Sequence, residues 1–326
     1  MKKTAAPSIL CAVMLLASII VAEAQQTGKI FRIGRLDVST ASGGAVVWEA
    51  FRKELSKLGW IEGKNITIEY RFAEQKFERV PELAAELVRL KVDLIVATGR
   101  NPALAAKEAT ATIPIVMMAP DPVGEGLVAS LARPGGNVTG LSNLTPELAT
   151  KRLEILKDTV PKLVRVGLLQ QAAGGDLPLK DLRAAAPVLK VKLEEIRTEP
   201  TTEGIESAFR TARQTKVDAI MISGGRAFFA ERRRIVEFAG KQRFPAIYPQ
   251  KEFVDEGGLM SYGADHDDLF RKAAHYVDKI LKGAKPADLP VQQATKFEFI
   301  INLKAAKQIG LTIPVRVLER ANKVLK

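Results

Sequence analysis

Polar side chains recur immediately after short apolar runs along this sequence of 326 residues. Hydroxyl groups suit a carboxylate, an aspartate such as Asp121 suits an ammonium group, and tyrosine rings suit an apolar or aromatic side chain. Together these chemistries indicate a binding site for a small organic molecule such as an amino acid. The candidate ligand-binding residues are Asp37, Ser39, Thr98, Asp121, Ser142, Asn143, Gln170, Ser223, Arg226, Tyr248 and Tyr262.

Several of these candidates also have a purely structural interpretation. Asp121 precedes Pro122, and this pair is typical of a helix start, with the aspartate as N-cap and the proline at the first helical position. Thr98 can close a turn, Arg226 can be a surface cation, and the two tyrosines can be core aromatics with satisfied hydroxyl groups. A binding role therefore depends on whether the fold brings these residues together.

Catalytic and cofactor chemistry finds little support in the sequence. Cys11 is the only cysteine, and His266 and His275 are nine residues apart, which is not the i, i+4 spacing of a metal pair. The segment 124–129 fits the dinucleotide pattern G-x-G-x-x-A, but it follows the fourth expected strand instead of the first. The sequence contains no P-loop and no G-x-S-x-G nucleophile elbow. We therefore expect no metal, no cofactor and no enzymatic activity.

The charge of the chain does not indicate nucleic-acid binding. The formal net charge is +12, but the lysines and arginines are spread along the expected helices. The tightest run, Arg232 to Arg234, stands beside Glu231 and Glu237, as on a solvated helix face. Aromatic residues make up only 6%, which argues against a stacking platform for bases.

The N-terminal segment has the three parts of a secretory signal peptide. Lys2-Lys3 form a positive region, Ile9 to Val21 an apolar region, and Ala22-Glu23-Ala24 a small-x-small cleavage site before Gln25. We expect residues 1–24 to be removed near Ala24-Gln25 after export by the Sec route, which leaves a periplasmic protein. No later run approaches the ~20 apolar residues that a membrane span needs.

Behind the candidate residues, strand-like and helix-like segments alternate in two series. The expected strands of the first series are Ile30–Leu36, Asn65–Tyr70, Asp93–Thr98, Ile113–Met118 and Asn137–Leu141. Those of the second are Leu163–Gln170, Val191–Arg197, Asp218–Ile222, Phe244–Tyr248, Gly258–Tyr262 and Phe297–Ile301. This alternation predicts an α/β fold of two doubly wound parallel-sheet lobes joined by a hinge. The strand carboxyl ends, and with them the candidates, are expected to face one cleft.

The same pattern predicts where helices begin and where the lobes meet. Asp121-Pro122 is expected to open a short helix from Val123 to Leu131, and a longer helix from Thr145 to Val160 is expected to bridge the lobes. We expect lobe 1 to comprise residues 25–143 with about 255–295, and lobe 2 to comprise 144–254 with about 296–326. Tyr262 then lies at the end of a strand that returns to the first lobe.

Four stretches carry a resemblance to a known family: Phe51 to Glu74, Asp93 to Gly99, Ile113 to Asn143 and Phe297 to Pro314. With these, the chain resembles the type I periplasmic binding proteins, and more specifically the ABC transporter substrate-binding proteins whose characterised members bind tryptophan, tyrosine or related amino acids. The resemblance implies a ligand closed between hinged lobes and delivered to a membrane permease driven by an ATPase. The sequence departs from the family in the loop after the third expected strand. Family members often begin this loop with small residues of the Thr-Pro type, whereas Gly99-Arg100-Asn101-Pro102 here contains an arginine.

We therefore expect a periplasmic receptor for a small, amino-acid-like and possibly aromatic solute, acting as a monomer without catalysis. One alternative is a ligand-sensing subunit of a membrane signalling protein. A second, less favoured, is a secreted enzyme that uses the same cleft. A LacI-like repressor shares this lobe architecture, but a signal peptide stands where its DNA-binding helices would be, which excludes this class of protein.

Overall fold

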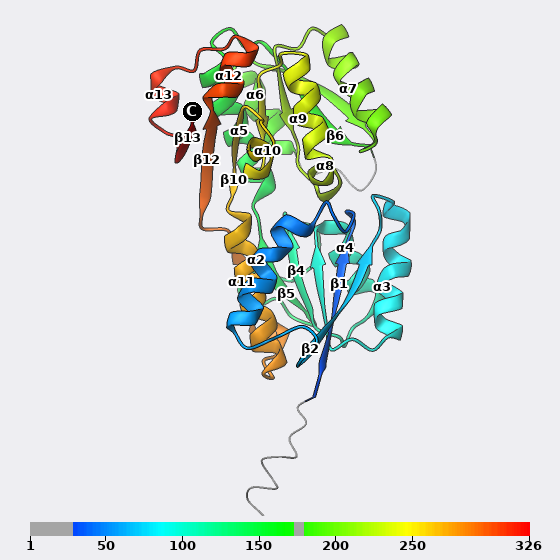
Figure 1. Cartoon of the computed structure of the whole chain (residues 1–326). Coiled ribbons are helices and arrows are strands. Elements are labelled where there is room, and N and C mark those ends of the chain that lie inside the picture. Colours follow the sequence, from blue (N-terminus) through cyan, green and yellow to red (C-terminus); the bar gives the residue numbers. More distant parts are fainter. Residues whose placement is uncertain (1–28, 173–178) are drawn as a thin grey trace, which may run out of the picture.

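The chain folds into two α/β lobes, one above the other, in a computed structural model that describes residues 29–172 and 179–326 (Figure 1). The expected signal peptide, its cleavage site at Ala24-Gln25 and Cys11 lie outside the described residues. Within the described part of the chain, no helix has the length and apolarity needed to cross a bilayer.

The sheet of the first lobe has the strand order β2-β1-β3-β4-β5-β11, and every pair of neighbours is parallel. Its strands are β1 (Phe31–Asp37), β2 (Ile66–Phe72), β3 (Leu94–Thr98), β4 (Ile115–Ala119), β5 (Val138–Ser142) and β11 (Gln292–Gln293). The strand order reverses between β1 and β3. Ligands of open α/β sheets bind outside the strand carboxyl ends at such a switch point.

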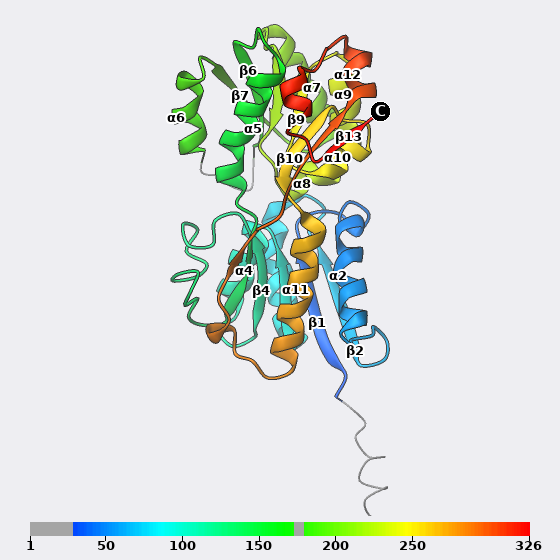
Figure 2. The same ribbon diagram turned by 90° about the vertical axis from the view of Figure 1, so that its left-hand side faces the viewer.

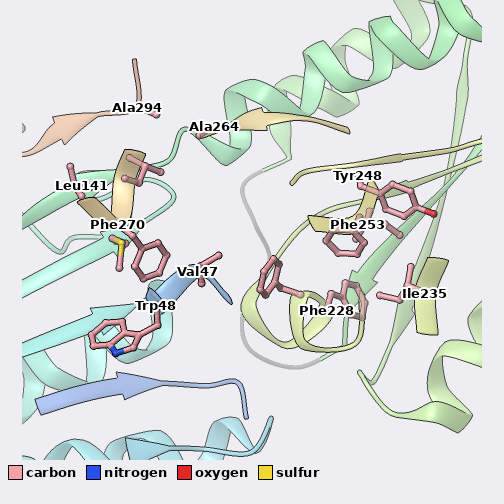
Figure 3. Packing of buried hydrophobic residues seen from close by; sticks show 14 of the residues in the cluster. Val47, Trp48, Leu141, Phe228, Ile235, Tyr248, Phe253, Ala264, Phe270 and Ala294 are labelled. Atoms are coloured by element: carbon pink, nitrogen blue, oxygen red, sulfur yellow. The ribbon is translucent and has the colours of Figure 1, made fainter. Parts of the chain in front are cut away.

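Helices cover both faces of this sheet because its strands are apolar on both sides. α2 (Ala45–Lys57) and α11 (His266–Leu281) pack on the face that receives Val96, while α3 (Val80–Arg89) and α4 (Arg100–Ala109) pack on the face that receives Ile95. Trp48 of α2 meets Phe270 of α11 edge to face, with ring centroids 6.3 Å apart (Figure 3).

The second lobe repeats this plan with the order β7-β6-β8-β9-β10-β12-β13. Its strands are β6 (Arg165–Gln171), β7 (Lys192–Thr198), β8 (Ala219–Ile222), β9 (Ala246–Tyr248), β10 (Met260–Ala264), β12 (Phe297–Asn302) and β13 (Lys323–Leu325). α5 (Thr145–Thr159) and α6 (Lys180–Val188) cover one face, and α7 (Thr202–Gln214) and α9 (Arg232–Lys241) cover the other. The short helices are α8 (Arg226–Ala230), α10 (Lys251–Asp255), α12 (Leu303–Ile309) and α13 (Val315–Leu318).

The two doubly wound lobes confirm the predicted fold class. One pair of neighbouring strands is not parallel, contrary to the prediction of parallel sheets. β12 runs antiparallel to β10, whereas the remaining pairs of this sheet are parallel. β12 enters from the first lobe, through the connection after β11, and so arrives from the opposite end of the sheet.

The chain crosses between the lobes after β5, after β10 and after β11 (Figure 2). We expected the second crossing near residue 255, but the structure places it after β10, which ends at Ala264. Met260 and Ser261 pair with Ile247 and Tyr248 of β9, so β10 completes the second sheet and only α11 returns to the first lobe. Tyr262 therefore belongs to the second lobe.

The expected helix from Val123 to Leu131 does not form; the segment is a series of turns. One helical turn is present, because Glu125 N donates to Asp121 O at 2.9 Å. Gly126 then adopts φ +68°, a left-handed conformation that ends the turn. The expected helix from Ala227 to Phe238 also breaks at Glu231, into α8 and α9.

Candidate functional site

The strand order of the second sheet reverses between β6 and β8. Residues near this switch point and near that of the first sheet meet across the cleft in a buried ion pair. Asp37 ends β1 of the first lobe, and Arg226 begins α8 of the second. Arg226 Nη2 donates to Asp37 Oδ2 at 2.8 Å, and Arg35 Nη2 donates to the same oxygen at 3.2 Å. Burial alone would raise the pKa of Asp37, but the two guanidinium groups hold it below its ordinary value.

Further contacts hold this pair in place. Ser39 donates to Asp37 Oδ1 through its backbone N–H at 3.0 Å and through its hydroxyl at 2.9 Å. Arg226 follows two glycines, and Gly225 has φ +106°, where a Cβ would lie 2.2 Å from Gln171 Nε2. A side chain at this position would be strained by the positive φ and would displace the amide of Gln171. Gln75 Nε2 also reaches Glu231 Oε1 at 2.9 Å, so the lobes are in contact.

A pocket lies between the lobes beside the crossover segments, and we call it the hinge pocket. Met118, Leu141, Leu148, Leu269 and Phe270 form an apolar wall. The remaining lining residues are Thr98, Gly99, Pro120, Asn143, Thr145, Arg152, Gly224, Gly225, Arg226, Pro249, Gln250, Ala264 and His266.

Several polar atoms of these lining residues are buried without a hydrogen-bond partner in the described chain. They are Thr98 Oγ1, Arg152 Nε, Arg226 Nη1, Gln250 Oε1 and His266 Nδ1. Buried polar atoms are nearly always paired with protein, water or a ligand. Their concentration around one apolar-walled cavity therefore indicates a place where water or a ligand supplies the missing partners.

Two of these side chains have pKa values shifted by burial. Burial lowers the pKa of Arg152 to about 10, and the side chain is only 1% exposed. Its Nη1 donates to Tyr262 O at 3.2 Å and its Nη2 to Thr145 O at 3.3 Å. Burial, with the charge of Arg226, lowers the pKa of His266 to about 4. At neutral pH the arginine is therefore charged and the histidine is neutral.

Three helix N-termini are also directed to this cavity. Gly99 precedes α4, Thr145 is the first residue of α5, and His266 is the first residue of α11. Helix N-termini carry a partial positive charge and unpaired N–H groups, which favour an anion. Gly99 has φ +100° and has no side chain to cap α4.

A second pocket, the distal pocket, shares Pro120 and the segment Gly224 to Arg226 with the hinge pocket. It is lined by polar groups of Gln170, Gln171 and Ser223 and by Arg100 at the start of α4. Gln170 Nε2 is buried without a partner in the described residues. The two pockets therefore lie on either side of Arg226 in one cleft.

The structure places seven of the predicted site residues at this cleft. Thr98, Asn143 and Arg226 line the hinge pocket, Gln170 and Ser223 line the distal pocket with Arg226, and Asp37 and Ser39 lie behind Arg226.

The other four predicted residues, like Asp37 and Ser39, line neither pocket. Asp121 Oδ1 accepts from Gly124 N at 3.0 Å, and the Ser142 hydroxyl donates to Pro120 O at 2.9 Å. Tyr248 is buried in the second lobe (Figure 3), where its ring stacks on Phe253 with a centroid distance of 4.9 Å. Tyr262 packs edge to face on Phe299.

The sequence-based reasoning missed the side chains of Arg152, Gln250 and His266. Arg152 stands seven residues after Thr145, two helical turns along the same face, and this spacing could have placed both at the cleft. Gln250 follows β9 by two residues, a position equivalent to those of the other candidates. His266 is the first residue of α11, and it was considered only as a metal ligand.

No group of three or more potential metal ligands occurs among the residues that the structure describes. The described lining of the hinge pocket likewise contains no nucleophile beside a general base. Its chemistry is therefore that of recognition: an apolar wall, two guanidinium groups and a few neutral polar atoms.

Comparison with known proteins agrees with this geometry. A protein-family model described as ABC transporter substrate binding protein matches residues 43–325. A tyrosine-binding protein of Clostridioides difficile (strain R20291) is 28% identical over 264 residues, which cover 81% of this chain and 76% of that protein.

Solved structures are similar over nearly the whole chain. A conserved domain protein from Vibrio cholerae is 28% identical with a TM-score of 0.82, covering 91% of this chain and 100% of that chain. An ABC domain from Streptococcus pneumoniae in complex with L-Trp is also 28% identical, with a TM-score of 0.79 and coverage of 90% and 99%. The family match spans most of the sequence, as the resemblance predicted. The chain therefore belongs to the ABC transporter substrate-binding proteins, a non-catalytic family, and is the solute-binding protein of an ABC transporter.

Proposed function

We propose that this chain is the periplasmic receptor of an ABC importer and binds a small, amino-acid-like ligand with an apolar or aromatic body in the hinge pocket. Residues 1–24 direct its export and are then cleaved. The mature protein acts as a monomer and passes its ligand to a membrane permease driven by an ATPase. The observation that carries the proposal is the set of unpartnered buried polar atoms around one apolar-walled cavity between the lobes.

The similar proteins support the choice of ligand. One is named for tyrosine binding, and another was solved with L-Trp. A tyrosine or tryptophan side chain suits the wall formed by Met118, Leu148, Leu269 and Phe270, because aromatic rings bury large apolar areas. We assign the carboxylate end to Arg152 and Arg226, which have unpartnered N–H groups here.

The cross-lobe ion pair connects binding to closure. Arg226 contacts Asp37 of the first lobe through Nη2 and Nε, while its Nη1 has no partner in the described chain. A ligand bound to Nη1 therefore contacts the residue that holds the lobes together. Asp37, Ser39, Gln170 and Ser223 act in this proposal by positioning Arg226 or by lining the approach to it.

Filling the hinge pocket tests the proposal. Leu148 lines it from α5 and is not fully buried, so Leu148→Trp should occupy the cavity without opening the core. Glu147→Trp is the matched control, because it adds the same ring to the exposed neighbouring position of α5. A panel of amino acids and aromatic acids is tested by thermal shift and calorimetry.

The expected outcome is a ligand-dependent rise in melting temperature that persists in Glu147→Trp and disappears in Leu148→Trp. A ligand at a hundredfold excess over its Kd adds roughly 2.7 kcal/mol to stability, which a melting curve resolves. Equal ligand shifts in both variants would place the binding site outside the hinge pocket and refute the assignment.

A further inference from the structure

The described lining of the hinge pocket contains two guanidinium groups and no carboxylate. Arg152 is 1% exposed and Arg226 is 9% exposed. Each has an N–H group without a partner among the described residues. The other unpartnered lining atoms belong to Thr98, Gln250 and His266, and none of these side chains is negatively charged. The pocket therefore presents an excess of buried positive charge to its ligand.

Asp37 is the carboxylate bonded to this lining, and its hydrogen-bonding capacity is already used. Its Oδ2 accepts from Arg35 and Arg226, and its Oδ1 accepts from Arg226 and twice from Ser39. A carboxylate offers about four lone-pair sites. An ammonium group of a ligand would have to displace one of these donors to reach it.

The acidic residues at the start of α11 are also paired. Asp265 lies 3.9 Å from Arg271, Asp267 bonds Lys251, and Asp268 bonds Lys272 and Lys296. Asp121, to which we expected an ammonium group to bind, lines neither pocket and accepts from Gly124 N.

The backbone adds to the positive potential. The N-termini of α4, α5 and α11, helices of 10, 15 and 16 residues, border the same cavity. Asn143 Oδ1 already accepts from Thr145 N at the start of α5, and Asp265 caps α11, so the uncapped start of α4 is the end that favours a negative group and disfavours a positive one. A zwitterionic amino acid would satisfy Arg152 and Arg226 with its carboxylate, but its ammonium group would be buried without a counter-charge. Burying an unpaired ion is strongly unfavourable.

We infer that the hinge pocket selects a carboxylic acid with an apolar or aromatic body and no amino group over the corresponding amino acid. This inference rests on the proposed function, because it names the ligand class of the same site. Gln250 Oε1 and Thr98 Oγ1 then suit a neutral polar group of the ligand, such as a hydroxyl or an indole N–H.

Calorimetry on the purified protein with matched ligands tests the inference. The probes are 3-(indol-3-yl)propionate, L-tryptophan and tryptamine, with 3-(4-hydroxyphenyl)propionate, L-tyrosine and tyramine as a second set. The propionates should bind at least about tenfold more tightly than the amino acids, and the amines should show no binding, because an unpaired buried charge is disfavoured. An amino acid that binds as tightly as its propionate would overturn the inference, and so would a set with no binding at all.

A variant that supplies the missing counter-charge gives an independent readout. Gln250→Glu places a carboxylate in the lining with almost no change in volume, and Gln250→Ala is the control without charge. The ratio of propionate to amino-acid affinity should fall at least about tenfold in Gln250→Glu relative to Gln250→Ala, since the ammonium gains a partner. An unchanged ratio would contradict the inference, provided that the melting temperatures of both variants show that they are folded.

The two proposals fail in different ways. If amino acids bind more tightly than propionates and Leu148→Trp abolishes their binding, the hinge pocket is the site and only the ligand class is wrong. If binding is unaffected by Leu148→Trp, the hinge pocket is not the site, and both proposals are wrong.

Discussion

Arg152 is a charged side chain held where almost no water reaches it, and replacing it should make the empty protein more stable. It lies within 4.0 Å of no carboxylate among the described residues; its contacts are two backbone oxygens. Most substitutions of buried residues destabilise a protein. Arg152→Met, which keeps an unbranched apolar stem and removes the charge, should do the opposite.

The magnitude follows from the pKa of Arg152, which burial lowers from its ordinary value to about 10. Each pKa unit corresponds to about 1.4 kcal/mol, so the charged form is disfavoured in the folded state by about 3 kcal/mol. Because the folded pKa is the lower one, this cost is fully present below about pH 10 and disappears only above the ordinary pKa of arginine. Methionine removes it, but leaves Tyr262 O and Thr145 O without this donor, at about 1 kcal/mol each.

The balance is a gain of about 1 kcal/mol for the ligand-free protein, or roughly 2 °C in melting temperature for a chain of this size. The ligand responds in the opposite direction. Loss of a charged hydrogen-bond donor to a carboxylate costs about 1.5–3 kcal/mol, so the Kd of 3-(indol-3-yl)propionate should rise about 10- to 100-fold.

Thermal unfolding of the ligand-free protein and calorimetry with this propionate measure the two effects. Arg210→Met is the matched control, because Arg210 is 63% exposed and, within the described residues, pairs only with Glu206 on the same helix; both quantities should be almost unchanged there. A lower melting temperature in Arg152→Met with unchanged affinity would show that the arginine stabilises the fold and does not contact the ligand.

Three further changes test other parts of the cleft. Asp37→Asn removes the charge shared by Arg35 and Arg226, so the free energy that favours the closed arrangement of the lobes should fall by about 3 kcal/mol. Small-angle scattering should then show a larger radius of gyration. An unchanged radius would mean that other contacts hold the lobes together. Gly225→Ala should lower stability by roughly 1–3 kcal/mol and weaken ligand binding through Arg226, because the residue has φ +106° and its Cβ would meet Gln171 at 2.2 Å. Gly240→Ala, in a helix with open space around the position, is its control and should be neutral or stabilising. Burial raises the pKa of Glu125 to about 7. The folded state therefore favours the protonated carboxyl, and the stability of the protein falls as pH rises from about 4.5 through about 7, where this group loses its proton. Glu125→Gln should melt at a higher temperature than the parent at alkaline pH and at the same temperature at acidic pH.

The sequence predicted the lobes well because their signals are local. Apolar runs such as Leu94–Thr98 and helical periodicity in Val80–Arg89 depend on neighbours within a few turns. The crossover near Ala264 was misplaced because it depends on pairing between β10 and β9, which no local pattern contains. The helix after Asp121 was wrong because the same Asp-Pro pair also begins a single turn, and Gly126 decides between the two outcomes.

The binding site was harder to predict because it joins residues that are far apart in the sequence. Asp37 and Arg226 were both candidates, but nothing local indicates that residues 189 positions apart form an ion pair. Arg152 was not a candidate, because an arginine in an amphipathic helix normally indicates an exposed position. Its burial follows from the arrangement of two lobes around α5.

The excess positive charge also bears on how closure depends on the ligand. With the lobes in contact, Arg35, Arg226 and Arg152 are all buried, while Asp37 is the carboxylate that bonds the first two. Closing without a ligand therefore desolvates guanidinium groups that lack a full complement of negative partners. An anionic ligand supplies the missing charge only in the closed form, where both lobes surround it, so it binds that form more tightly. A ligand shifts a conformational equilibrium only by this difference in affinity. A neutral molecule of the same shape would then fill the hinge pocket and yet close the lobes less completely.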